Sequence, residues 1–113
     1  MALHHAKPGE VIDLRPLGPG LKETKSATIV KSAEFEAIRL IVAAGAEIPR
    51  HAVPGSITLH CLEGRIGLDL DGSSLELGAS EWVHLEGGAP HAVRGIEDSA
   101  VLLTIMFDAG SGS

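Results

Sequence analysis

The sequence predicts an all-β domain, a sandwich or a barrel, and three observations support this prediction. Short apolar stretches alternate with turn residues from Ala27 to near the end of the chain. Two of the connections, Glu63-Gly64 and Asp71-Gly72, are tight turn signals. The chain has 113 residues, of which 44% are hydrophobic and 21% charged, as in one globular domain. We therefore expect a single domain with one β core.

The chain divides into three parts. Residues 1–26 carry several prolines and glycines, which predict an extended arm with a short strand at 10–14 and no sustained helix. Residues 27–108 carry the strand rhythm and are expected to form the barrel. Residues 109–113, AGSGS, are expected to be a flexible tail.

The expected strands follow from the apolar stretches between turn residues. In the stretch before Asp71-Gly72, Ile66, Leu68 and Leu70 alternate with polar or small residues, which predicts a hairpin with one core face. By the same reasoning Glu63-Gly64 predicts that the strands on either side of it are antiparallel neighbours. The expected strands are 27–31, 35–43, 56–62, 65–71, 74–78, 81–86, 91–96 and 99–107.

Charge and composition exclude several functions. The formal net charge is -6 and no Lys/Arg cluster forms a stripe, so nucleic-acid and anionic-membrane partners are not expected. Cys61 is the only cysteine, so no internal disulfide is possible and a reducing compartment is favoured. The N-terminus lacks a signal-peptide core and no apolar run approaches about 20 residues. We predict a soluble cytoplasmic protein.

The last predicted strand is apolar on both faces. Val101, Leu103, Ile105 and Phe107 alternate with Leu102, Thr104 and Met106, and Ile41 and Trp82 add to the second face. Such a face is usually covered, which predicts a homodimer. A covering by the N-terminal arm of the same chain explains the pattern equally well, and both explanations stay open.

The stretch from Gly45 resembles the first motif of the cupin superfamily, in particular the small single-domain conserved-barrel cupins. That motif has a glycine, two histidines separated by one residue, a glutamate and a closing glycine. Here the glycines and the first histidine match, and the second histidine and the glutamate are replaced. The corresponding residues are Gly45, His51, Val53, Ile57 and Gly64.

The second cupin motif is matched in part by EGGAPHAV. Gly88 and His91 stand at family positions, whereas Ser80, Glu86 and Gly95 replace the usual glycine, proline and asparagine. The resemblance implies a double-stranded β-helix, or jelly-roll barrel, over residues 27–107. It does not select a function, because cupins include enzymes, storage proteins and sensors.

The resemblance implies a metal inside the barrel, held by the histidines and glutamate of the first motif and the histidine of the second. Only His51 and His91 remain of that set. A catalytic zinc or non-haem iron site needs a third protein ligand. Two alternatives stay open for the cofactor: one divalent transition metal (Zn, Fe, Ni or Mn), or none.

Other side chains are weaker candidates. If Ile57 faces inward, Leu59 and Cys61 also face inward and His60 faces outward. Cys61 then lies roughly 13 Å along the strand from the glutamate place, too far to share a metal with His51. His84 is expected on the outer face unless the register slips. His4, His5, Glu47 and Glu86 are expected to be solvated.

Val53 in place of the second motif histidine and Ile57 in place of the glutamate predict an apolar pocket with two polar groups, His51 and His91, at its mouth. The pocket is expected to be lined by Val53, Ile57, Leu59 and Cys61. We predict a barrel that binds a small molecule around His51 and His91 with weak or no metal. The alternative is a metal-dependent enzyme of the dioxygenase or isomerase type that uses both histidines as ligands. A third possibility is a scaffold whose barrel interior is filled by its own side chains.

Overall fold

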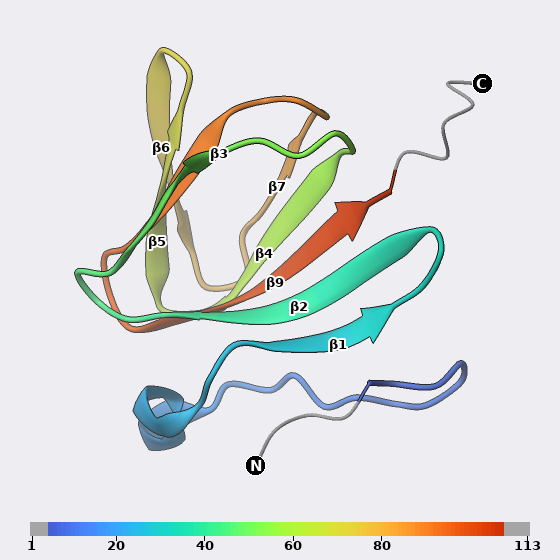
Figure 1. The fold of residues 1–113 in the computed structure, drawn as a ribbon. Coiled ribbons are helices and arrows are strands. Elements are labelled where there is room, and N and C mark those ends of the chain that lie inside the picture. Colours follow the sequence, from blue (N-terminus) through green and yellow to red (C-terminus); the bar gives the residue numbers. More distant parts are fainter. Residues whose placement is uncertain (1–4, 108–113) are drawn as a thin grey trace.

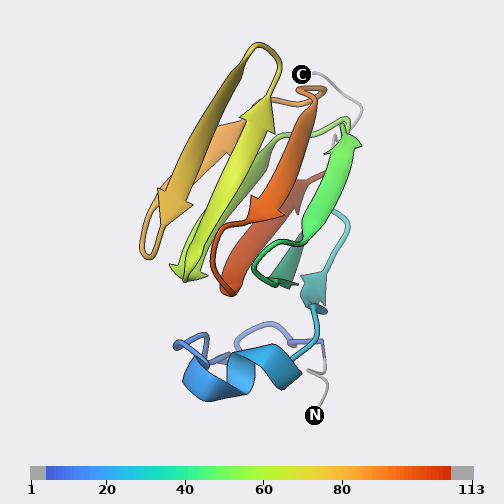
Figure 2. The ribbon, with the colours of Figure 1, turned by 90° about the vertical axis from the view of Figure 1, so that its left-hand side faces the viewer.

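The computed structural model describes residues 5–107, and the strands of this part form two facing antiparallel sheets (Figure 1). One sheet has the order β1-β2-β9-β4-β7 and the other the order β3-β8-β5-β6. Figure 2 shows the four-stranded sheet in front of the five-stranded one. The strands are β1 (Ala27–Lys31), β2 (Phe35–Val42), β3 (Glu47–His51), β4 (Ile57–Glu63), β5 (Arg65–Leu70), β6 (Ser73–Gly78), β7 (Trp82–Leu85), β8 (His91–Gly95) and β9 (Ser99–Met106).

The core lies between the two sheets and follows the alternation of the strands. In β4, every second residue is buried, and its neighbours in β9 and β7 at the same height are apolar as well. The four-stranded sheet contributes Ile66 and Leu68, which are both fully buried. The buried core comprises Val42, Ile57, Leu59, Cys61, Ile66, Leu68, Leu77, Leu85, Val93 and Val101. The predicted all-β barrel is confirmed.

The hairpin at Asp71-Gly72 is confirmed. Strands β5 and β6 pair along their length, from Leu70 opposite Ser73 beside the turn to Arg65 opposite Gly78. Gly72 in the turn has a φ of 81°. The outer face of this sheet is polar, as predicted. There Arg94 forms an ion pair with Asp69.

The predicted pairing across Glu63-Gly64 is wrong. Strand β4 pairs with β7 and β9, whereas β5 pairs with β6 and β8, so this connection carries the chain from one sheet to the other. Gly64 has a φ of 84°, and the backbone of Asp98 and Ser99 fills the space where a Cβ would lie. A shift in register between Cys61 and Glu63 bends the strand just before it. The turn therefore forms a corner of the barrel and not a hairpin.

One strand, β3, was missed by the sequence reasoning. It contains Pro49 between Ile48 and Arg50 and has no apolar alternation. Proline is tolerated there because β3 is the edge strand of its sheet. On the open side of an edge strand no backbone N–H is needed for pairing with a neighbouring strand. The omission matters because this strand carries His51.

The N-terminal arm lies along β1 and across one end of the barrel. Residues 10–14 form no strand, contrary to the prediction, and the short 3₁₀ helix η1 (Gly18–Glu23) follows. The Glu63 carboxylate accepts hydrogen bonds from the backbone N–H of Leu17 and of Gly18, both at 2.8 Å. The N–H of Ala6 donates to the carbonyl of Ile29. Residues 1–4, with His4, and the predicted tail 109–113 lie outside the described residues.

The outer face of the five-stranded sheet is partly open. Trp82 is 59% exposed and Met106 41% exposed, whereas Leu102 and Thr104 are half-buried. η1 packs near Ile41 at one end of this sheet. The homodimer predicted from this face stays a prediction. Among the described residues, no helix has the length and apolar character that crossing a bilayer requires.

Candidate functional site

The two histidines of the sequence prediction meet at one end of the barrel, where β3 ends and β8 begins. We call this end the mouth. His51 and His91 are direct partners across the two strands. Their rings are 4.5 Å apart between centroids and inclined by 57°. The pairing of an edge strand with its neighbour therefore places two imidazoles in contact.

Both rings are held by the same local contact. The Nδ1 of His51 lies 3.0 Å from the carbonyl oxygen of Pro49, and the Nδ1 of His91 lies 3.0 Å from that of Ala89. A carbonyl oxygen can only accept, so each contact is a hydrogen bond when Nδ1 carries the proton. In the neutral ring, the proton on Nδ1 leaves a lone pair on Nε2. The site thus presents two acceptor nitrogens.

The two rings differ in exposure. His91 is 4% exposed and has Leu70 of β5 as its partner on the other side, whereas His51 is exposed on the edge strand. His91 is therefore the deeper member of the pair. A ligand arriving from solvent meets His51 first.

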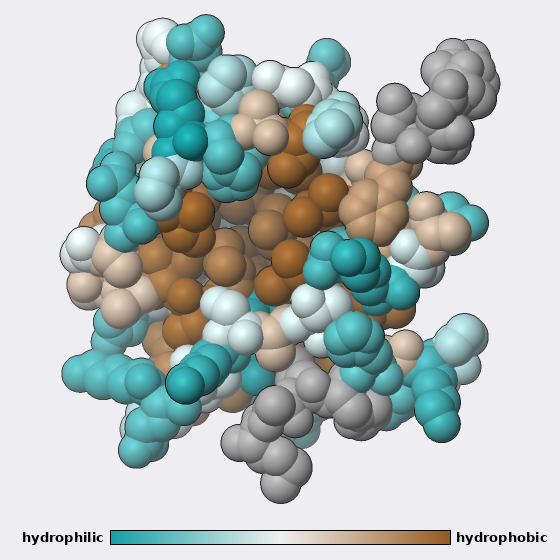
Figure 3. All heavy atoms as spheres, viewed as in Figure 1, coloured by the Kyte–Doolittle hydropathy of each residue, from teal (hydrophilic) through white to brown (hydrophobic). Residues whose placement is uncertain are grey.

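An apolar pocket of about 400 Å³ opens at the same end of the barrel. It lies between the loop that follows β3 and the end of β9. Figure 3 shows apolar side chains gathered in a hollow between the two sheets. The pocket is lined by Val53, Pro54, Gly55, Ile105, Met106 and Phe107.

The four predicted pocket residues fall into two groups. Val53 lines the pocket at the mouth. Ile57, Leu59 and Cys61 face inward, but they are at most 3% exposed and belong to the packed core below it. Burial raises the pKa of the Cys61 thiol, so thiolate is scarce at neutral pH. The lower barrel is thus filled, and free space remains at the mouth.

The other histidines within residues 5–107 are His5, His60 and His84, and they do not join the pair at the mouth. His60 and His84 lie on the outer face of the five-stranded sheet, where their strand partners are Trp82 and Thr58. His5 is exposed in the arm. Glu47 and Glu86 are exposed as well. Of the predicted polar candidates that lie within residues 5–107, the structure brings His51 and His91 together.

The donor set at the mouth does not fit a three-ligand metal site. Within residues 5–107, no group of three or more His, Cys, Asp or Glu side chains is arranged to hold a metal ion. Two imidazoles supply two ligands, and a zinc or non-haem iron site needs a third protein ligand. The neighbours that replace the missing ligands, Val53 and Ile57, are apolar.

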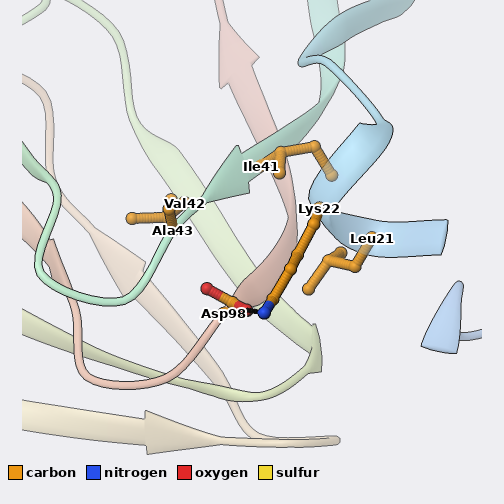
Figure 4. Close-up of a pocket in the computed structure, with 6 residues that line it drawn as sticks. All are labelled: Leu21, Lys22, Ile41, Val42, Ala43 and Asp98. Carbon is orange, nitrogen blue, oxygen red and sulfur yellow. Dashed lines mark ion pairs between the residues drawn. The ribbon is translucent and has the colours of Figure 1, made fainter. Parts of the chain in front are cut away.

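A smaller hollow of about 190 Å³ lies at the opposite end, between η1 and the barrel. Figure 4 shows Leu21 and Lys22 of η1 facing Ile41 and Asp98 across it. The Lys22 Nζ and Asp98 Oδ2 are 4.0 Å apart. This hollow is remote from the histidine pair and is part of the contact that seats the arm.

Sequence reasoning missed most of the pocket at the mouth. Pro54 and Gly55 were assigned to a loop, and Ile105, Met106 and Phe107 to a strand. They meet because β9 pairs antiparallel with β4, although the two strands are distant in sequence. This pairing brings the end of β9 beside the loop that leads into β4. The Pro-Gly pair after His51 was the only local signal for a loop at the mouth.

Comparisons with known proteins agree with this architecture. A profile of the cupin domain family matches residues 38–107. A conserved protein of unknown function from Streptococcus pyogenes superimposes with a TM-score of 0.75 at 19% identity, with 97% of each chain covered.

Two further solved structures have the same fold. A cupin superfamily protein from Desulfitobacterium hafniense gives a TM-score of 0.73 at 17% identity, with 87% of this chain and 95% of that chain covered. An RmlC-like cupin from Shewanella frigidimarina gives 0.70 at 20% identity, with 99% and 97% covered. A search of the curated proteins found no match.

Proposed function

Because this chain belongs to the cupin family, we propose that the mouth of its barrel binds a small ligand that has an apolar body and one hydrogen-bond donor. The ligand donates to the histidine pair and places its apolar part in the pocket at the same end of the barrel. Binding on this proposal needs no metal. An apolar pocket with a few convergent polar groups is the usual form of a small-molecule site.

The observation that carries the proposal is the pair of Nδ1 contacts. With each Nδ1–H donated to a backbone carbonyl, both rings offer only the Nε2 lone pair. Two acceptor nitrogens cannot hydrogen-bond to each other, so each needs a donor from another group. A ligand O–H or N–H group meets this need, and an ether or ketone oxygen does not.

The pocket supports the apolar part of the ligand. Its volume of about 400 Å³ suits a small molecule. Val53 lies two residues after His51, so the pocket and the histidine pair share one loop. The filled core beneath, with Leu59 at 1% exposure, limits how far a ligand enters the barrel.

The alternative function, a metal-dependent enzyme, has the same two histidines as ligands. Histidines that ligate metals commonly donate the other ring nitrogen to a backbone carbonyl, which both rings do here. The third ligand is what the described residues lack. Metal binding by this pair is therefore expected to be weak.

A matched ligand series tests the proposal. Each small aromatic or branched aliphatic body is offered as an alcohol and as its methyl ether, and binding is followed by NMR shifts of His51 and His91. We expect the alcohols to bind about five- to thirtyfold more tightly, because one ligand hydrogen bond to a histidine acceptor is worth about 1 to 2 kcal/mol. His91→Phe, which keeps a ring and removes the acceptor, is expected to abolish this preference.

The control is His84→Phe, which changes an exposed histidine on the outer sheet face. It is expected to leave the preference for alcohols intact. Equal binding of alcohols and ethers would contradict the acceptor role of the histidines. Binding that leaves the pocket residues unshifted would contradict the location.

A further inference from the structure

Arg39 is a buried cation for which residues 5–107 offer no hydrogen-bond or ion-pair partner. It lies in the middle of β2 and is 8% exposed. Its Nε atom is sealed from solvent and has no hydrogen-bond acceptor. Within the described residues it takes part in no ion pair. A buried donor left unsatisfied is costly, more so when it is charged.

The sheet register places Arg39 on the outer face, in one row with other side chains. Its partner in β9 is Leu102, whose partner in β4 is His60, and Trp82 of β7 follows. Neighbouring strands lie about 4.8 Å apart, so the Cα atoms of Arg39 and His60 are about 10 Å apart, on either side of Leu102. Both side chains are long enough to meet above that leucine.

The next row on the same face adds more donors and no acid. Thr104, Thr58 and His84 stand side by side there, next to Ala37 of β2. None of these polar side chains makes a hydrogen bond with another described residue. The two rows thus combine Arg, His and Thr donors around an apolar centre of Leu102 and the exposed Trp82.

We propose that this surface binds a small organic carboxylate. Arg39 and His60 donate to the carboxylate, and the apolar part of the ligand lies over Leu102 toward Trp82. A guanidinium and a carboxylate form short, charge-assisted hydrogen bonds, so a carboxylate supplies the counter-ion that Arg39 lacks within residues 5–107. The site faces away from the histidine pair at the mouth and is independent of the proposed function.

Charge argues against two other occupants. A nucleic acid is repelled by the net charge of -6. Two copies of the chain packed face to face about a two-fold axis would bring two Arg39 cations into one interface without an acidic partner from either row, because the two rows contain no acidic residue. A single small anion satisfies Arg39 without this conflict.

Thermal unfolding with sodium benzoate, against sodium chloride at the same concentration, tests the proposal. Benzoate is expected to raise the Tm of the wild type above the chloride value, and this difference is expected to vanish in Arg39→Met. Arg39→Met is also expected to be as stable as the wild type in chloride, since it removes an unpaired buried charge. Arg15→Met, which changes an exposed arginine, is the matched control and is expected to keep the benzoate effect.

NMR distinguishes this site from the mouth. Benzoate is expected to shift the Arg39 Nε–H and the Leu102 amide, with at least tenfold weaker binding in Arg39→Met and no change in His51→Ala. Arg39→Lys, which keeps the charge and loses the fork, is expected to weaken binding less and serves if Arg39→Met does not fold. If the alcohols and ethers bind equally at the mouth, the benzoate shifts at Arg39 are still expected. The two proposals can therefore be refuted independently.

Three results would overturn the proposal. The first is an equal benzoate effect in the wild type and Arg39→Met. The second is an equal effect of sulfate and benzoate, which would remove the role of the apolar part. The third is a dimer by light scattering whose Arg39 Nε–H is unaffected by benzoate, which would assign the face to a second copy.

Discussion

Replacing Val53 by histidine and Ile57 by glutamate is expected to create a tight metal site at the barrel mouth. In the cupin family these two places hold the second histidine and the glutamate, and His51 and His91 are already present. We expect the double variant to bind Zn²⁺ at least roughly a thousandfold more tightly than the wild type, because its protein ligands rise from two to four. Isothermal titration calorimetry of both proteins measures the difference.

The structure supports both substitutions. Val53 lies at the pocket, two residues after His51, and Ile57 begins β4 with an inward side chain that is 3% exposed. A glutamate buried there without metal destabilises the barrel, so Zn²⁺ is also expected to raise the Tm of the double variant strongly. The control is Val53→Asn with Ile57→Gln, which adds polarity without a carboxylate or imidazole. Wild-type protein that already binds Zn²⁺ as tightly as the double variant would refute this account of the site.

Replacing Gly64 by alanine is expected to lower the free energy of unfolding by about 2 to 4 kcal/mol. The left-handed backbone at Gly64, with a φ of 84°, costs an alanine about 1 kcal/mol. The new Cβ also collides with the Asp98 carbonyl and the Ser99 backbone, and overpacking of this kind costs roughly 1 to 3 kcal/mol. Urea denaturation at unchanged slope measures the loss.

Gly72→Ala separates the two contributions. Gly72 has nearly the same φ, 81°, but no atom lies within 4 Å of a Cβ built on it. Its alanine variant is expected to lose only about 1 kcal/mol, the cost of the backbone conformation. Equal losses at the two glycines would contradict the tight packing of Asp98 and Ser99 against the corner at Gly64.

The sequence predicted most of the fold because strand rhythm and turn chemistry are local properties. The hairpin at Asp71-Gly72 followed from its turn residues, and the inward face of β5 from alternation. The inward face of β4 followed from the motif position of Ile57 together with alternation. The corner at Gly64 did not, since a glycine with positive φ suits a hairpin and a corner equally. What decides between them is the packing of Asp98 and Ser99, which lie far along the chain.

The candidate site was predictable in part. The motif spacing singled out His51 and His91, and the structure places them in contact. Their strand, β3, was missed because an edge strand tolerates Pro49 and needs no apolar face. The pocket at the same end of the barrel is formed by the loop after β3 and the end of β9, which are distant in sequence. The surroundings of the buried Arg39 become apparent only when β2, β9 and β4 are paired in the sheet. Neither can be read from a local pattern.

The ring tautomers of His51 and His91 test the central claim most directly. The account predicts that both neutral rings carry the proton on Nδ1 and leave Nε2 as an acceptor. Long-range ¹H–¹⁵N correlation spectra, recorded at a pH where both rings are neutral, distinguish the two nitrogens. An Nδ1–H tautomer in both rings agrees with a site that accepts a ligand donor, and an Nε2–H tautomer in either ring would contradict it.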